Sequence, residues 1–193
     1  MSDKVSVVIA MPLIESVKMQ TVMSLLGMIS MATYPIDVVF VKDSSIHEAR
    51  KSSVIKAREI GASHIFFFDS DMSIDYGAIN KLLSYQKDIV GVNYHAKHIP
   101  IESVIKFQDE NGKVVQTEVP QNSLFRCYAI GTGACLISMD VFNRIEEPWF
   151  FYESSSTLVM SDDVWFCRQA QRAGIDVFCS SEIVAKHIGD YEY

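Results

Sequence analysis

Two aspartates separated by one residue are the strongest candidates for chemistry in this chain. Asp69 and Asp71 directly follow an uninterrupted apolar run, Ile65-Phe66-Phe67-Phe68. Carboxylate oxygens are the ligands that Mg²⁺ and Mn²⁺ prefer, and two neighbouring negative charges are stabilised by a cation. An isolated Asp-x-Asp triplet is also common as a helix cap beside a solvated turn. The position of this pair after a predicted buried strand favours a metal site, because ligands gather at the carboxyl ends of strands in parallel sheets.

Two further groups could complete such a site. His187, near the end of the sequence, can supply a neutral imidazole nitrogen as a third metal ligand, although a histidine there is also typical of a protein surface. Asp162 and Asp163 follow Ser161 and precede an amphipathic run. They can cap that helix and complement its dipole, or one of them can act as a general base toward an acceptor hydroxyl.

Several other residues have an open role. In Gly131-Thr132-Gly133, the missing side chains can admit a sugar or an acceptor to the backbone, or they can mark a bulge or a tight bend. Taken alone, Arg50 can be an ordinary solvated residue of the second predicted helix. His95 and His98 lack the further ligands that a zinc site needs, so these histidines and Lys97 are left as candidates for neutralising phosphate or lining a cleft.

The elements that must position these residues begin with alternating strands and helices. Apolar, β-branched runs predict strands at residues 5–10, 36–41, 64–68 and 89–92, and amphipathic stretches predict helices at 17–31, 45–60 and 75–85. Ser45 and Glu48 have the spacing of a capping box, and Gly61 is a helix stop. Three successive strand–helix units predict a parallel, doubly wound sheet, which brings Asp43 and the Asp69–Asp71 pair to one edge.

The sequence pattern of the second half of the chain predicts antiparallel strands. Residues 104–107 and 114–119 flank Asn111-Gly112, a strong hairpin signal. We expect a strand at 128–139 that is broken by its glycines, helices at 140–145 and 162–173, and a strand at 176–179. Because no linker, repeat or low-complexity tract separates the two halves, the sequence predicts a single α/β domain over residues 1–193.

Composition sets limits on function. The 193 residues are 49% hydrophobic and 21% charged, which excludes disorder as the main state, and a net charge of −7 disfavours a broad nucleic-acid surface. The four cysteines contain no Cys-x-x-Cys pair, so we expect reduced, buried thiols. Pro12 interrupts the first apolar run, and no stretch approaches the about 18 apolar residues of a membrane span, so we expect a soluble, cytoplasmic protein.

Taken in order, six short motifs resemble those of a small GT-A glycosyltransferase, of the glycosyltransferase family 2-like type found in bacteria and phages. The resemblance covers nearly the whole chain, and its specificity lies in the order of motifs that are individually weak. The motifs are Val7-Val8-Ile9-Ala10-Met11-Pro12, Glu48-Ala49-Arg50, Phe66-Phe67-Phe68-Asp69-Ser70-Asp71-Met72, Gly131-Thr132-Gly133-Ala134-Cys135-Leu136-Ile137, Ser161-Asp162-Asp163-Val164-Trp165-Phe166-Cys167 and His187-Ile188-Gly189.

This resemblance implies a fold, a reaction and a set of site residues. The fold would be GT-A, a Rossmann-like and mostly parallel sheet flanked by helices, with residues 1–100 as the nucleotide-sugar-binding half and 101–193 as the acceptor-side half. Mn²⁺ or Mg²⁺ would be bound by Asp69, Asp71 and His187, and the nucleotide by Pro12, Asp43, Arg50, Asp69 and Ser70. Gly131, Thr132 and Gly133 would face the sugar or the acceptor.

The reaction implied by the resemblance is transfer of a sugar from a nucleotide diphosphate-sugar, with UDP as the first candidate, to a hydroxyl acceptor of unknown class. Asp163 maps onto the base of inverting members, whereas Asp162 stands where the family usually has Glu. Nucleic acid is not indicated as a partner by the net charge, but it stays open as an acceptor. Two alternatives remain: a nucleotidyltransferase, although Met11-Pro12-Leu13-Ile14-Glu15 is not a Gly-rich phosphate loop, and a noncatalytic nucleotide- or glycan-binding module.

Overall fold

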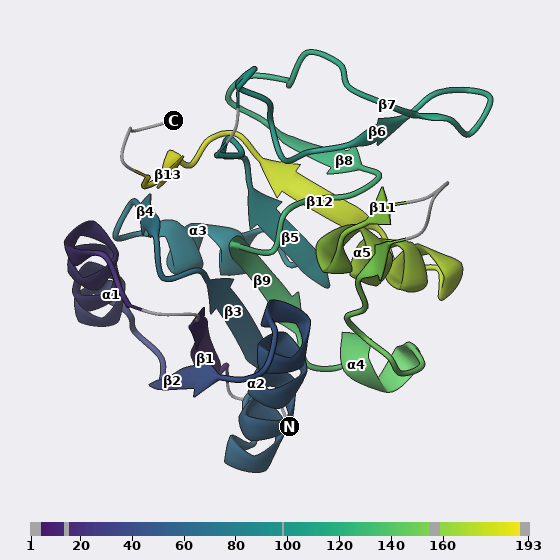
Figure 1. The fold of residues 1–193 in the computed structure, drawn as a ribbon. Helices are drawn as coiled ribbons and strands as arrows, with labels where there is room; N and C mark the ends of the chain where they lie inside the picture. The colour runs from purple at the N-terminus through teal and green to yellow at the C-terminus, as the bar shows by residue number, and fades with distance from the viewer. Residues whose placement is uncertain (1–4, 14–15, 98, 155–158, 190–193) are drawn as a thin grey trace.

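The computed structural model describes residues 5–13, 16–97, 99–154 and 159–189. Within these residues, a seven-stranded mixed sheet forms the centre of an α/β fold (Figure 1). The strands are, in spatial order, β2 (Ile36–Lys42), β1 (Val7–Leu13), β3 (His64–Phe68), β9 (Ala134–Ser138), β5 (Ile89–Val92), β12 (Val177–Ser180) and β8 (Leu124–Cys127).

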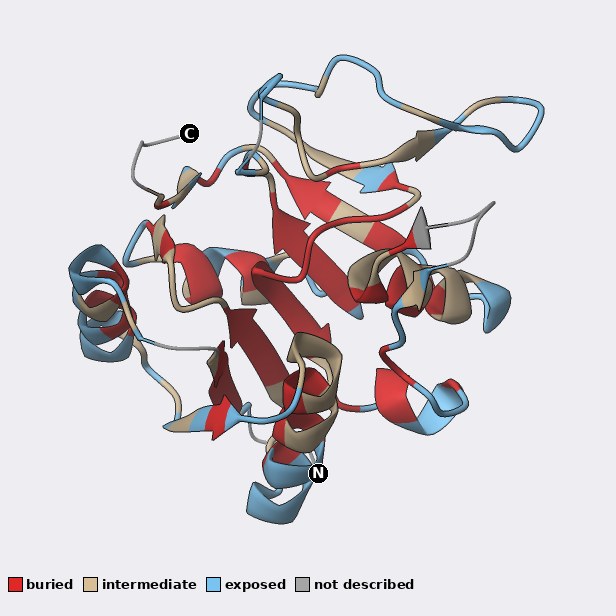
Figure 2. Ribbon diagram, in the orientation of Figure 1, coloured by how far each residue is buried: buried red, intermediate tan, exposed pale blue. Residues whose placement is uncertain are grey.

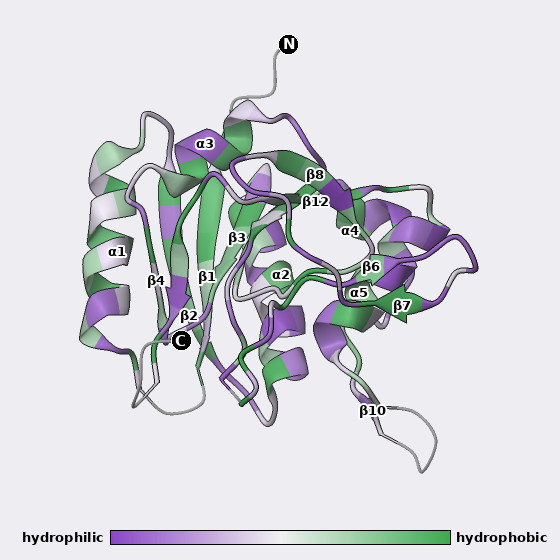
Figure 3. Cartoon of the chain, turned by 90° about the horizontal axis from the view of Figure 1, so that it is seen from above, coloured by the Kyte–Doolittle hydropathy of each residue, from purple (hydrophilic) through white to green (hydrophobic). Residues whose placement is uncertain are grey.

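Helices cover both faces of this sheet. One face carries α1 (Met19–Met31) and α3 (Ala78–Ser84), and the other carries α2 (Ile46–Ile60), α4 (Val141–Arg144) and α5 (Asp162–Arg172) (Figure 3). Alternate residues of the central strands divide between the two layers: Val8 and Ala10 pack on the α2 side, whereas Val7 and Ile9 pack on the α1 side. The central strands are therefore buried on both faces (Figure 2), which explains their continuous apolar sequences.

Three small two-stranded sheets complete the described secondary structure. β4 (Met72–Ile74) pairs with β13 (Ala185–His187), β6 (Phe107–Gln108) with β7 (Val114–Val115), and β10 (Glu153–Ser154) with β11 (Val159–Met160). The β6–β7 hairpin turns at Gly112, whose φ of 77° is accessible to glycine at little cost. The hairpin predicted at Asn111-Gly112 is therefore confirmed, although its strands are shorter than expected.

At α2, the predicted glycine stop and the Ser45 half of the predicted capping box are confirmed. Ser45 Oγ accepts a hydrogen bond from the Glu48 backbone N–H at 3.4 Å, and Gly61 ends the helix in the left-handed conformation with φ of 78°. This cap places the first turn of α2, with Ile46, after the carboxyl end of β2, at the sheet edge where we expect ligands.

The prediction of a parallel sheet holds only in part. β2, β1 and β3 are parallel to one another, as are β5 and β12, but β9 enters between β3 and β5 and is antiparallel to both. β9 belongs to the second half of the sequence, so the two halves share one sheet. Residues 128–133 of the expected strand at 128–139 lie outside β9, because the strand begins only after Gly133.

Other differences are local. β1 continues through Pro12 to Leu13, which is tolerated because β1 is paired with β3 only as far as Ala10. β4, β8 and β13 were not predicted. No helix among the described residues has the length and apolar character needed to cross a membrane.

Candidate active site

A pocket of about 400 Å³ opens at the carboxyl ends of β1 and β3. Five of the residues that line it were predicted from the sequence, and three, Ser16, Lys18 and Ile46, were not. The full lining is Pro12, Ser16, Lys18, Ile46, Asp69, Ser70, Asp71 and His187. The structure therefore brings the acidic pair and the late histidine to one concavity, although more than 115 positions separate Asp71 from His187 in the sequence.

Asp69 is held by a buried arginine. Arg50, on α2, is 5% exposed, and its Nη2 lies 3.2 Å from Asp69 Oδ1 and 3.3 Å from Asp69 Oδ2. Burial raises the pKa of the Asp69 carboxyl above its ordinary value, and Arg50 offsets only part of that shift. An added cation near Asp69 would therefore stabilise its charged form.

The same guanidinium also binds Asp162. Arg50 Nη1 donates to Asp162 Oδ2 at 2.6 Å, and Asp162 is 7% exposed. Burial alone would lower the pKa of Arg50, but the charges of Asp69 and Asp162 outweigh it and raise that pKa. Arg50 is absent from the pocket lining and acts here by orienting two carboxylates. The Asp162 carboxylate, proposed from sequence as a catalytic group, is engaged in this ion pair.

Asp71 meets three groups of the chain itself. Lys97 Nζ donates to Oδ2, His187 Nε2 lies 3.3 Å from Oδ1, and the Ile188 backbone N–H donates to the Asp71 carbonyl at 2.7 Å. Burial opposes ionisation of Asp71, but the hydrogen bonds from His187 and Lys97 outweigh it and lower its pKa to about 2. Asp71 is therefore an anion at neutral pH.

The orientation of His187 is set by its second ring nitrogen. His187 Nδ1 lies 3.2 Å from the carbonyl oxygen of His95, which can only accept, so this hydrogen bond requires a proton on Nδ1. Nε2 can therefore bond to the Asp71 carboxylate only while it also carries a proton, and without that proton its lone pair is available to a metal ion. A ligating histidine typically donates its other N–H to a carbonyl in this way.

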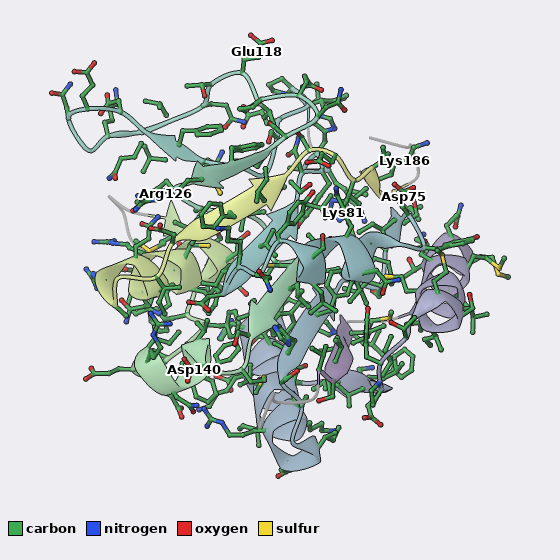
Figure 4. The ribbon with its side chains drawn as sticks, turned by 180° about the vertical axis from the view of Figure 1, so that it is seen from behind. Asp75, Lys81, Glu118, Arg126, Asp140 and Lys186 are labelled. Carbon is green, nitrogen blue, oxygen red and sulfur yellow. The ribbon has the colours of Figure 1, made fainter. Side chains whose placement is uncertain are left out.

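The segment that leads into β13 is held in place by several contacts. In β13, His187 pairs with Met72 of β4. On the way to β13, Lys81 Nζ binds Glu182 Oε2 at 2.7 Å, and the Val184 N–H donates to Asp75 Oδ2 at 3.3 Å. Figure 4 shows Lys81 and Asp75 close to Lys186 at this corner of the molecule. Pairing of β13 with the short β4 strand thus places His187 beside Asp71.

Ser70 contributes its backbone to the site. Its carbonyl oxygen accepts from the Lys18 N–H at 2.9 Å and from Thr21 Oγ1 at 3.1 Å. These bonds fasten the first turn of α1 to the loop between the two aspartates. Lys18 lines the same pocket as the acidic pair.

Asp163 is the second carboxylate at the start of α5. Its Oδ1 accepts from Ser161 Oγ and, at 2.8 Å, from the Val164 N–H. Burial raises the pKa of the Asp163 carboxyl, and the adjacent charge of Asp162 adds to this effect. Asp163 does not line the pocket as described, but its charge and that of Asp69 both act on Tyr94, so it lies near the acidic pair.

Tyr94 is the group that the sequence reasoning missed. It is 6% exposed, its Oη accepts the Gly133 N–H at 2.9 Å, and burial raises its pKa well above the ordinary value. A Cβ on Gly131 would lie 2.4 Å from Tyr94 Oη, and a Cβ on Gly133 would lie 2.6 Å from the same atom. The group that comes close to the backbone of this loop is therefore Tyr94. All three loop residues are buried. Their contact with a sugar or an acceptor stays a prediction.

Of the remaining predicted residues, Asp43 lies apart from the pocket and His98 is not among the described residues. Asp43 is exposed and accepts from the Ser44 N–H and Ser52 Oγ, and these bonds lower its pKa. It follows β2 but does not line the pocket. His98 lies outside the described residues. Lys97 and His95, whose roles the sequence left open, are brought to Asp71 and His187 respectively.

The donor chemistry of the pocket fits a hard divalent cation through two protein ligands. In the described parts of the chain, no three His, Cys, Asp or Glu side chains are grouped so as to hold a metal ion. Asp71 and His187 nevertheless offer one carboxylate and one correctly oriented imidazole. Mg²⁺ and Mn²⁺ sites often rely on one or two protein ligands, with substrate phosphates and water as the others.

Comparison with known proteins adds information on the fold. No protein-family model matches the chain, and no curated protein matches it in sequence. The chain shares its fold with A197 from STIV. That crystal structure superposes with a TM-score of 0.69 over 96% of this chain and 86% of A197, at 14% sequence identity. At this identity the likeness concerns the arrangement of helices and strands, and the activity must be argued from the site.

Proposed function

We propose that this protein is a metal-dependent glycosyltransferase of the GT-A type, which moves a sugar from a nucleoside diphosphate-sugar to a hydroxyl acceptor. The observation that carries the proposal is the contact between Asp71 and His187 in a pocket at the carboxyl ends of β1 and β3. One oxygen donor and one nitrogen donor meet where nucleotides bind in sheets of this kind. The volume of about 400 Å³ lies within the range of small-ligand pockets.

Each residue then has a defined task. Asp71 and His187 would hold a divalent metal ion, which when bound supplies positive charge to the departing diphosphate. Lys18 lines the same pocket and can bind phosphate oxygens. Arg50 fixes the Asp69 carboxylate, and the surface formed by Pro12 and Ile46 is suited to an apolar part of the donor.

In the transfer step, the acceptor oxygen bonds to the anomeric carbon while the bond from that carbon to the diphosphate oxygen breaks. The diphosphate leaves with the bonding electrons. Asp163 takes the proton of the acceptor hydroxyl; its raised pKa suits a group that must hold this proton at the moment of attack. Attack from the face opposite the diphosphate inverts the configuration of the sugar.

The test is ligand-dependent stabilisation followed by turnover. In a thermal-shift series with UDP, GDP and ADP, each with and without Mn²⁺, the melting temperature should rise most when nucleotide and metal are both present. Asp71→Ala should abolish this shift, whereas Asp140→Ala, at the surface and outside the pocket, should retain it. Absence of any metal-dependent shift would contradict the proposal.

Turnover separates an enzyme from a binding module of the same fold. The wild-type protein should slowly hydrolyse a UDP-sugar in the presence of Mn²⁺, with water in place of the acceptor. Release of pyrophosphate from a nucleoside triphosphate and a sugar phosphate would instead indicate a nucleotidyltransferase.

A further inference from the structure

Both oxygens of the Asp71 carboxylate are engaged by groups of the chain itself. Oδ2 accepts from Lys97 Nζ, and Oδ1 faces His187 Nε2. Lys97 therefore occupies the carboxylate that the proposed function assigns to a metal ion. A divalent cation and an ammonium group repel each other at one carboxylate, so the two compete for Asp71.

The segment that carries Lys97 is held close to the pocket. It follows β5, and its backbone is tied to residues 102–104 by the Ala96 N–H, which donates to Glu102 O at 2.9 Å, and by a bridge between His95 and Ser103. The carbonyl of His95 also accepts from the His187 ring. These bonds restrain the backbone, while the lysine side chain, 29% exposed, has free bonds about which to turn.

We propose that Lys97 is an internal counter-ion of Asp71 that a divalent metal ion displaces, and that its ammonium group then binds the diphosphate of the nucleotide. This proposal rests on the proposed function. A diphosphate brought into the pocket offers Lys97 a new anionic partner at the moment when the metal ion takes its old one. The total charge around Asp71 thus stays compensated before and after ligand binding.

A thermodynamic coupling follows. When the metal ion binds alone, Lys97 must leave Asp71 without gaining a new partner. The apparent affinity for the metal ion therefore equals the intrinsic affinity multiplied by the fraction of molecules in which the ion pair is open. When the nucleotide is bound, that cost falls. Each ligand therefore strengthens binding of the other by the same factor.

The experiment measures Mn²⁺ binding by electron paramagnetic resonance of the free ion, in the absence and presence of UDP, for the wild-type protein and Lys97→Met. In the absence of UDP, Lys97→Met should bind Mn²⁺ about fivefold more tightly, the size expected for loss of a partly exposed competing ion pair. The increase in Mn²⁺ affinity caused by UDP should be smaller in this variant than in the wild-type protein. Lys97→Arg should retain the wild-type coupling in part, because it keeps the positive charge.

Lys106→Met is the matched control. It removes the same charge from a nearby segment, but Lys106 Nζ bonds Gln116 Oε1 at 2.8 Å, away from Asp71. It should leave both Mn²⁺ affinities unchanged. Equal Mn²⁺ affinity in Lys97→Met and the wild-type protein would overturn the role of Lys97 while leaving the proposed function intact. A wild-type protein that binds neither Mn²⁺ nor UDP would overturn both.

Discussion

Arg50 Nη1 lies 2.6 Å from Asp162 Oδ2 in the interior of the protein, although 112 positions separate the two residues. Because Nη2 of the same guanidinium binds Asp69, one side chain of α2 joins the loop after β3 to the first turn of α5. A single buried cation therefore contacts both the proposed metal-side loop and the helix that carries Asp163.

Removal of that cation should destabilise the fold strongly. Arg50→Met leaves the buried Asp162 carboxylate and the partly buried Asp69 carboxylate without their partner, and we expect the free energy of unfolding to fall by about 3–5 kcal/mol. Lys51→Met, one position along, is the control, because its ion pair with Glu147 is exposed and should contribute no more than about 1 kcal/mol. Urea unfolding of the two variants measures the difference, and equal losses would contradict the role given to Arg50.

A methyl group at Gly133 should disturb the site directly. An added Cβ would lie 2.6 Å from Tyr94 Oη and 2.8 Å from Asp69 Oδ2, so one of these groups must move. We expect Gly133→Ala to lower the melting temperature and to weaken metal-dependent UDP binding about tenfold or more, since overpacking typically costs about 1–3 kcal/mol. Gly77→Ala should be tolerated, because its Cβ would meet only Met31 Cε, at 3.8 Å. Unchanged UDP binding in Gly133→Ala would show that this contact relaxes without effect.

Asp163→Asn should stabilise the protein while removing activity. Since burial raises the pKa of Asp163 in the folded state, the folded protein holds this proton more tightly than the unfolded chain does. Stability is therefore lost as the pH rises above the ordinary pKa of aspartate. The variant should melt at a higher temperature than the wild-type protein at pH 7, with the difference vanishing near pH 3.

Sugar transfer by Asp163→Asn should fall about 100- to 10,000-fold while UDP binding persists. Asp140→Asn is the control for the change in charge, because Asp140 lies at the surface (Figure 4) and should show neither effect. Full transfer by Asp163→Asn would eliminate it as the base.

The four cysteines should be inert in the folded protein. All are buried and free, as the sequence predicted, and burial raises the pKa of each thiol, that of Cys127 to about 12. We expect no reaction with Ellman's reagent in native buffer. In denaturant, all four thiols should react and release four equivalents of thionitrobenzoate per chain. Rapid labelling of the native protein would indicate an opening of the layer between the sheet and α5.

The sequence predicted the first half of the fold well, because its signals are local. The capping box at Ser45, the glycine stop at Gly61 and the continuous apolar run before Asp69 each depend on neighbours within a few residues. The same run located the acidic pair correctly at the edge of the sheet, where the pocket opens.

The second half depends on partners that are distant in sequence. Nothing in Ala134–Ser138 indicates that it enters between β3 and β5 in the antiparallel direction, because a strand buried on both faces has the same apolar pattern in either direction. β4 and β13 are three residues long and are strands only because they pair with each other. Their register nevertheless decides that His187 reaches Asp71.

By itself, the sequence determined which side chains could do chemistry, and it placed Asp43 and the Asp69–Asp71 pair at strand ends. Only the tertiary structure decided which groups they bond to: Asp162 bonds to Arg50, Asp71 to Lys97, and His187 to the carbonyl of His95. Strand and helix signals act through the backbone over a few residues, whereas an ion pair or a hydrogen bond forms between whichever groups the packing of distant segments brings within about 4 Å of each other.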